Sequence, residues 1–167
     1  LYAQALKRSD KVFFQNPDDL KLFQEMCLLD INKPTVVVNG SGVNVQDFDV
    51  MPLPKNEQGQ VKTSFLLIAR LLGDKGVREY AESARIIKEK HPEAEFHLVG
   101  WIDDNPSAIS QAELDTWIAD GRLKYWGKLS DVRPAIAECS VYVLPSYREG
   151  TPRTVLEAMA MGRAVIT

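Results

Sequence analysis

Short apolar runs alternate with longer helical patterns along most of the 167 residues, and this alternation restricts the fold most strongly. The runs are nearly continuous in apolar residues, as in strands that are covered on both faces. We expect strands at residues 12–15, 35–38, 64–69, 95–99, 123–125, 141–144 and 164–167. We expect helices at residues 18–29, 77–90, 110–120, 132–138 and 152–161. This order predicts an α/β fold with a parallel sheet flanked by helices.

Composition excludes several classes of protein. Twenty Lys and Arg against 23 Asp and Glu give a net charge of −3, which argues against nucleic acid as a partner. No apolar run approaches the roughly 18 residues of a membrane span, and the start lacks a signal-peptide pattern. Cys27 and Cys139 lack metal-ligand spacing, so we expect two reduced thiols at core positions in a reducing compartment.

The residues that follow each expected strand matter most for function. An open parallel sheet binds ligands at the carboxyl ends of its strands, near the point where the strand order reverses. The segments at these ends are residues 39–42, 70–76, 100–101, 126–128 and 145–150.

The segment 144–162 carries the strongest motif. Thr151 is expected to cap a helix with Pro152 at its first position, and such a helix start attracts phosphate. Glu149 precedes the cap, and Glu157 lies about 9 Å along the helix from Thr151. Carboxylates accept hydrogen bonds from hydroxyls and repel phosphate, so the layout suits a nucleoside-diphosphate sugar. Spacing alone leaves open that Glu149 is a solvated loop charge and Glu157 a surface residue.

Two further segments fit the same ligand. Arg70 and Lys75 follow a central strand and can neutralise a diphosphate without a metal ion. The alternative is that both are exposed loop cations, paired with Asp74. Gly127, in the run Tyr125-Trp126-Gly127-Lys128-Leu129, allows its backbone to approach a flat base, while Trp126 itself is interpreted as a core residue. His91 and His97 are paired neither with each other nor with cysteines, so we expect no metal site.

Together these segments resemble the retaining glycosyltransferases of the GT-B fold, family 4 (glycosyl transferases group 1). The matching pieces come in family order from about residue 9 onward. They are Val38-Asn39-Gly40-Ser41-Gly42-Val43-Asn44 with Phe48, Ile68-Ala69-Arg70-Leu71 with Lys75-Gly76, Leu98-Val99-Gly100, Trp126-Gly127, and residues 144–162 continuing into Val165-Ile166.

The resemblance implies that the chain is the Rossmann-like C-terminal half of a GT-B fold, with a short piece of the N-terminal half. Residues 1–33 would be the end of the N-terminal (acceptor) domain and linker. Residues 34–167 would be the C-terminal nucleotide-sugar-binding domain, truncated at its C-terminus. Because the acceptor half would be missing, we expect this chain alone to transfer no sugar.

The resemblance also assigns roles to matching residues. Arg70 and Lys75 would hold the diphosphate and, with Glu149, carry catalysis, while Glu149 contacts the donor sugar. The other donor-binding residues would be Gly150, Thr151 and Pro152 against sugar and phosphate, Thr154 and Val155 at the phosphates, Glu157 at the ribose, and Lys128 and Leu129 at the base. No cofactor and no metal are expected.

The function implied is a hexosyltransferase-type enzyme of bacterial polysaccharide biosynthesis. It would transfer a sugar from a nucleoside-diphosphate sugar, with UDP favoured, to a glycan or lipid-linked acceptor, in the cytoplasm or peripherally at the inner face of the membrane. Two alternatives stay open at this point. One is a nucleotide-sugar epimerase of the UDP-N-acetylglucosamine 2-epimerase type. The other is a flavodoxin-like interaction module, which would not gather Arg70, Lys75, Glu149 and Glu157 at one sheet edge.

Overall fold

The structure, a computed structural model, describes residues 2–167 and divides them into two units. The first unit comprises the described residues up to Val43 together with Glu149–Arg153. The second comprises Asn44–Arg148 and Thr154–Thr167. The predicted domain boundary near residue 34 concerns the complete protein and stays a prediction.

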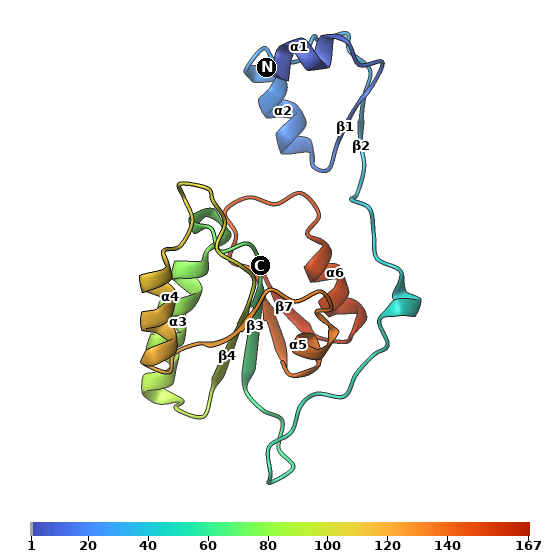
Figure 1. The fold of residues 1–167 in the computed structure, drawn as a ribbon. Helices are drawn as coiled ribbons and strands as arrows, with labels where there is room; N and C mark the ends of the chain where they lie inside the picture. Colours follow the sequence, from blue (N-terminus) through green and yellow to red (C-terminus); the bar gives the residue numbers. More distant parts are fainter. Residues whose placement is uncertain (1) are drawn as a thin grey trace. The chain divides into compact units, whose positions relative to one another are not determined.

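The second unit is built on five parallel strands in the order β5-β4-β3-β6-β7. They are β3 (Ser64–Ile68), β4 (Glu95–Val99), β5 (Lys124–Gly127), β6 (Val141–Val143) and β7 (Ala164–Ile166). Figure 1 shows α3 (Val77–Lys90) and α4 (Gln111–Ala119) on one side of the sheet and α5 (Arg133–Ala137) and α6 (Arg153–Ala160) on the other. The predicted α/β fold, a Rossmann-like parallel sheet flanked by helices, is confirmed.

The strand order reverses at the centre of this sheet. From β3 the chain proceeds outward to β4 and β5, then returns to the other side of β3 to form β6 and β7. β3 and β6 are direct neighbours, with Phe65 opposite Val141 and Leu66 opposite Tyr142. A ligand crevice is therefore expected where the chain leaves β3 and β6.

The core explains why β3 is central. Leu66 and Leu67 are fully buried although they point to opposite faces, because helices cover both faces. Tyr80 of α3 is also buried, and its hydroxyl donates to the His97 carbonyl at 3.0 Å. Burying each such side chain stabilises the fold by roughly 1.5–3 kcal/mol.

Side-chain contacts fix the start of α4 and its place beside α3. Ser110 and Glu113 form a capping box, with the Ser110 amide donating to Glu113 Oε2 at 2.9 Å. Arg78 of α3 donates to Glu113 Oε1 at 2.6 Å. The hydrogen bond from Arg78 is the main reason why the pKa of Glu113 is lowered to about 2.

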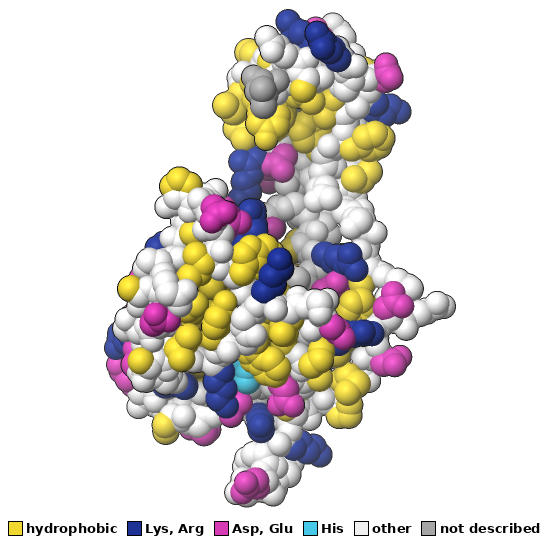
Figure 2. All heavy atoms as spheres, in the orientation of Figure 1, with side chains coloured by type: hydrophobic (Ala, Val, Ile, Leu, Met, Phe, Trp, Pro, Cys, Tyr) yellow, Lys and Arg dark blue, Asp and Glu magenta, His cyan; other side chains and the backbone are white. Residues whose placement is uncertain are grey.

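The first unit contains α1 (Tyr2–Lys7), β1 (Val12–Phe14), α2 (Pro17–Glu25) and β2 (Thr35–Val37). β1 and β2 pair in parallel as a two-stranded sheet. Asn16 caps α2 by accepting from the Asp19 amide at 2.6 Å. Hydrophobic side chains reach the surface of this unit (Figure 2), among them Tyr2, Phe13, Met26 and Ile31.

Two expectations about individual side chains are wrong. Cys139 is buried, which raises the pKa of its thiol to about 12, but Cys27 is exposed instead of lying in a core. Trp126 is not a core residue: it is 36% exposed, and its indole N–H donates to His97 Nδ1 at 2.9 Å. A polar partner on the neighbouring strand therefore holds Trp126 at the surface.

His97 belongs to a connected row of four side chains across β4 and β5, with Trp126, Glu95 and Lys124. Its Nε2 lies 3.2 Å from Glu95 Oε2, and Glu95 Oε1 lies 2.7 Å from Lys124 Nζ. Because Trp126 donates to Nδ1, the proton of the neutral ring lies on Nε2 and faces Glu95. Burial lowers the pKa of His97 below 6.5, although Glu95 acts in the opposite direction.

We predict that His97 weakens the fold as the pH falls. Below pH 6.5 the ring becomes protonated in the unfolded chain while it stays neutral in the folded chain. The free energy of unfolding therefore decreases as the pH falls, until the pH passes the lowered pKa of the folded state. An NMR titration of the His97 ring should give a midpoint below 6.5. A midpoint at or above 6.5 would contradict the prediction.

Candidate functional site

The carboxyl ends of β3, β4 and β5 are bound closely together. The Leu71 amide donates to the Trp101 carbonyl at 2.9 Å, and the Tyr125 hydroxyl donates to the Gly100 carbonyl at 2.9 Å. A Cβ added at Gly100, whose φ is +153°, would lie 1.9 Å from the Ala69 carbonyl oxygen. Only glycine permits this approach between the segments that follow β3 and β4.

These segments line a cavity of about 250 Å³. Its walls combine the ends of β3 and β4, the segment after β5 and the first turn of α6. The lining residues are Ile68, Ala69, Arg70, Val99, Gly100, Trp101, Lys128, Leu129, Val132 and Thr154. This volume is below the roughly 300 Å³ at which pockets for drug-sized ligands begin, so the cavity suits one ring-sized part of a larger ligand.

The cavity brings together four predicted site residues from three segments: Arg70, Lys128, Leu129 and Thr154. Arg70 Nη1 lies 3.2 Å from Asp103 Oδ2, so Arg70 pairs with the loop after β4. Lys128 Nζ lies 4.6 Å from the centroid of the Trp101 ring, as a cation–π contact. Sequence reasoning noted that Trp101 follows a strand but did not select it as a site residue.

Lys75 lies in a loop that packs against the segment leading to Glu149. The 3₁₀ turn η2 (Gly73–Lys75) precedes α3, and the Asp74 carbonyl accepts from the Tyr147 amide at 3.0 Å and from Ser146 Oγ at 3.2 Å. Tyr147 also donates to Glu79 Oε1 at 2.6 Å, which lowers the pKa of Glu79. The loops after β3 and β6 are thus joined at the predicted crevice.

Gly76 makes this contact between the loops possible. Its φ is +69°, and an added Cβ would lie 2.1 Å from the Pro145 carbonyl oxygen. Both the backbone conformation and the space therefore require glycine.

We predict that Gly76→Ala destabilises the chain by at least about 2 kcal/mol, from left-handed strain of about 1–2 kcal/mol plus the clash. Gly59→Ala is the matched control, because Gly59 has φ +77° but nothing within 4 Å of an added Cβ. Urea unfolding of both variants measures the difference. Equal losses in the two variants would show that the Pro145 contact contributes nothing.

Tyr142 positions Thr154 at the cavity. Tyr142 is fully buried, and its hydroxyl lies 2.6 Å from Thr154 Oγ1 and 3.2 Å from the Ile68 carbonyl oxygen. This hydroxyl therefore connects the end of β3 with the first turn of α6. Glu157, one turn further along α6, is only 7% exposed, so it is not the surface residue that spacing alone left open.

We predict that Tyr142→Phe lowers the free energy of unfolding by about 1–3 kcal/mol, because the buried Ile68 carbonyl and the half-buried Thr154 hydroxyl lose a hydrogen bond. Tyr147→Phe is the control, since Tyr147 is 73% exposed and its hydroxyl contacts an exposed carboxylate. Its change should stay within about 0.5 kcal/mol. The same unfolding measurement compares them, and an unchanged midpoint for Tyr142→Phe would refute the assignment.

Glu149, Gly150, Thr151 and Pro152 belong to the first unit. Asn16 Nδ2 donates to the Glu149 carbonyl at 3.3 Å, and a Cβ at Gly150 would meet Gln15 Oε1 at 2.7 Å. The side chain of Thr151 packs against Gly40, where a Cβ would lie 2.4 Å from Thr151 Cβ. The expected convergence of Glu149 with Arg70 and Lys75 stays a prediction, because these residues belong to different units.

The start of α6 differs slightly from the expectation. The helix begins at Arg153, one residue after the predicted first position at Pro152. Val155 and Glu157 lie on this helix, outside the lining of the 250 Å³ cavity.

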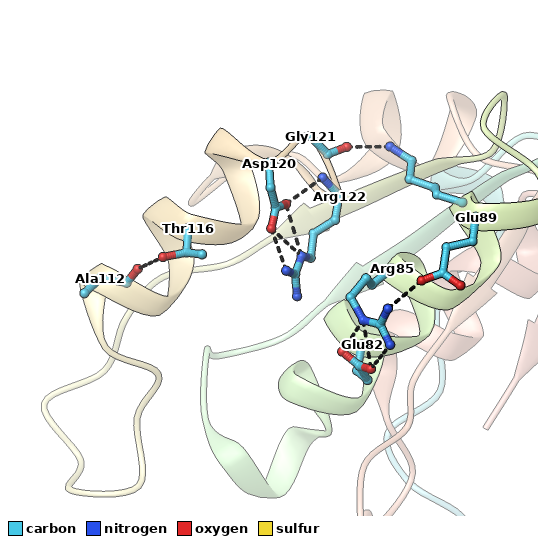
Figure 3. Close-up of polar contacts among 9 residues, drawn as sticks. Glu82, Arg85, Glu89, Ala112, Thr116, Asp120, Gly121 and Arg122 are labelled. Atoms are coloured by element: carbon cyan, nitrogen blue, oxygen red, sulfur yellow. Dashed lines mark hydrogen bonds and ion pairs between the residues drawn. The ribbon is translucent and has the colours of Figure 1, made fainter.

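A second charged cluster lies at the opposite edge of the sheet (Figure 3). Arg85 of α3 pairs with Glu82 and Glu89, Arg122 pairs with Asp120, and Lys88 donates to the Gly121 carbonyl. Its residues border a hollow of about 310 Å³. Each guanidinium group pairs with a carboxylate close to it in the sequence, and the hydrogen bond from Lys88 to Gly121 joins α3 to the turn before β5 as a structural contact.

Within residues 2–167, no three His, Cys, Asp or Glu side chains come together as a metal site. None of the helices formed by these residues has the length and apolar character needed to cross a membrane.

Comparison with known proteins gives consistent matches. The sequence model of the family described as glycosyl transferases group 1 matches residues 62–167. A curated relative is the N,N'-diacetylbacillosaminyl-diphospho-undecaprenol alpha-1,3-N-acetylgalactosaminyltransferase of Campylobacter jejuni, 35% identical over 174 residues. That match covers 99% of this chain but 44% of the relative, so the chain spans less than half of the relative's length.

Solved structures share the fold at low sequence identity. Sucrose-phosphate synthase from Thermosynechococcus elongatus is 21% identical with a TM-score of 0.73, covering 98% of this chain and 41% of that one. The pneumococcal O-GlcNAc transferase GtfA, determined with UDP and GlcNAc, is 18% identical with a TM-score of 0.64, covering 98% and 31%. These neighbours support the C-terminal half of a GT-B fold.

Proposed function

This chain belongs to the glycosyl transferases group 1 family, and we propose that it forms the donor-binding part of a retaining, family 4 glycosyltransferase. The observation that carries the proposal is the cavity at the carboxyl edge of the sheet, which is shared by Arg70, Lys128, Leu129 and Thr154. The donor is a nucleoside-diphosphate sugar whose base enters this cavity between Lys128 and Leu129.

Arg70 and Lys75 hold the diphosphate in this proposal. Cleavage of the anomeric bond leaves negative charge on the departing diphosphate, and fixed cations favour that state more than the ground state. Each such interaction contributes up to about 3 kcal/mol to catalysis. The pairing of Arg70 with Asp103 supports the proposal, because it holds the guanidinium at the cavity wall before the ligand arrives. No metal ion is required in this scheme.

The carboxylates bind the two hydroxyl-rich parts of the donor. Glu157 accepts hydrogen bonds from the ribose, and Glu149 contacts the donor sugar and takes part in catalysis with Arg70 and Lys75. Gly150, Thr151 and Pro152 lie against sugar and phosphate, and Thr154 and Val155 face the phosphates. Its place on α6, the helix whose first turn carries Thr154 of the cavity wall, supports the role of Glu157.

The acceptor is a glycan or a lipid-linked sugar, bound in the N-terminal domain of the complete enzyme. The Campylobacter relative supports this, because its name specifies a sugar carried on diphospho-undecaprenol. UDP is the favoured nucleotide, which the UDP-bound pneumococcal neighbour supports. Transfer to such an acceptor would occur at the inner face of the membrane, as part of bacterial polysaccharide biosynthesis.

We predict that UDP binds this chain more tightly than GDP or ADP. We also predict that Arg70→Ala weakens the binding of UDP about tenfold to a hundredfold, because the diphosphate loses a hydrogen-bonded cation. Isothermal titration calorimetry measures both effects. Arg85→Ala is the matched control, since the side chains of Arg85 and Arg70 are 46% and 49% exposed and Arg85 lies in the cluster at the opposite edge. Equal losses in both variants would contradict a diphosphate site at Arg70.

A further inference from the structure

Trp101 is an aromatic residue in the wall of the cavity at the carboxyl edge. It is the second residue after β4, and its carbonyl accepts from the Leu71 amide at 2.9 Å, which fixes its backbone. Trp101 lines the cavity, yet it remains 39% exposed. A large aromatic side chain left half-uncovered in a cavity wall is available for a flat ligand.

The chemistry of the walls selects the kind of ligand. Ile68, Val99, Leu129 and Val132 supply apolar surface, and the Thr154 hydroxyl is already engaged by Tyr142. A sugar ring in this cavity would leave most of its hydroxyls without partners, which is costly. A heteroaromatic ring stacks on a tryptophan face and needs polar partners only along its edge.

Lys128 occupies the Trp101 ring in the structure, with Nζ 4.6 Å from the centroid. A cation–π contact at an exposed site is equivalent to about a two- to fivefold preference. Stacking of a base on an aromatic side chain is equivalent to about a five- to 150-fold preference. A base therefore displaces the lysine from the ring, and the freed ammonium group then lies beside the entering ligand as a hydrogen-bond donor.

We infer that Trp101 is the stacking residue for the base of the nucleotide and determines that the site takes nucleoside diphosphates in preference to plain diphosphates. The inference rests on the proposed function and adds a residue that the resemblance did not assign. Since every base has a π-face, Trp101 sets affinity for a base as such and leaves the choice among bases to other contacts.

The chain contains its own control residue. Trp126 is 36% exposed, which matches Trp101, but its indole donates to His97 and it does not line the cavity. The third tryptophan, Trp117, is only 8% exposed and stays the same in every variant.

The experiment titrates UDP, GDP, ADP and inorganic pyrophosphate into the chain and its Trp101→Leu, Trp101→Phe and Trp126→Phe variants. Tryptophan fluorescence and calorimetry are read together, and circular dichroism checks folding. We expect nucleotides, but not pyrophosphate, to quench the fluorescence of the chain and of Trp126→Phe, and not that of Trp101→Leu. Trp101→Leu should weaken each nucleotide that binds by about five- to 150-fold and leave pyrophosphate unchanged. Trp101→Phe should retain most of the affinity.

Two results would overturn the inference in different ways. If Trp101→Leu binds nucleotides as tightly as the unaltered chain while Arg70→Ala does not, stacking on Trp101 is refuted and the donor-binding function stands. If no nucleoside diphosphate binds the unaltered chain, or if pyrophosphate binds as tightly as the nucleotides, the base pocket itself is refuted. Absence of all nucleotide binding would also refute the proposed function.

Discussion

The parallel pairing of β3 with β4 on one side and β6 on the other is the constraint on which the second unit depends. Because all three strands run in the same direction, the chain leaves each of them at the same edge of the sheet. Since β5 is also parallel to β4, residues as distant in sequence as Arg70, Lys128 and Thr154 reach one cavity at this edge. The hydrogen bonds among the segments after these strands, such as that from Leu71 to Trp101, then fix the walls.

The cavity and the neighbouring loop contacts share the same structural elements. β3 contributes Ile68 to the wall and its carbonyl to the Tyr142 hydroxyl, which in turn contacts Thr154. The segment after β3 carries both Arg70 and the turn that packs against Pro145. Backbone packing thus fixes the segment that carries Arg70 and Lys75, so this part of the backbone needs little reordering when a charged ligand binds.

Sequence patterns predicted the strands and helices of the second unit because its central strands are nearly continuous apolar runs and the buried residues of α3 recur at helical spacing. β4 and α3 have the predicted bounds, and the other elements differ by a few residues at their ends. The family resemblance also placed Arg70, Lys128, Leu129 and Thr154 in one site, and the cavity joins them. In contrast, the surroundings of Trp126 depend on His97 on another strand, and no local pattern records that contact. Trp101 was missed for a similar reason, because its exposure follows from the walls around it.

The separation of the charged cluster from the cavity has a consequence for how such a protein can diversify. The hydrogen bond from Lys88 to the Gly121 carbonyl secures α3 to the turn before β5, at the edge of the sheet that faces away from the cavity. Several of the residues around the cavity, among them Trp101, Lys128 and Val132, lie in connections between elements and do not belong to the strand ladder. Substitutions there can accumulate in evolution without loss of the scaffold, so that descendants with altered ligand preference remain able to fold.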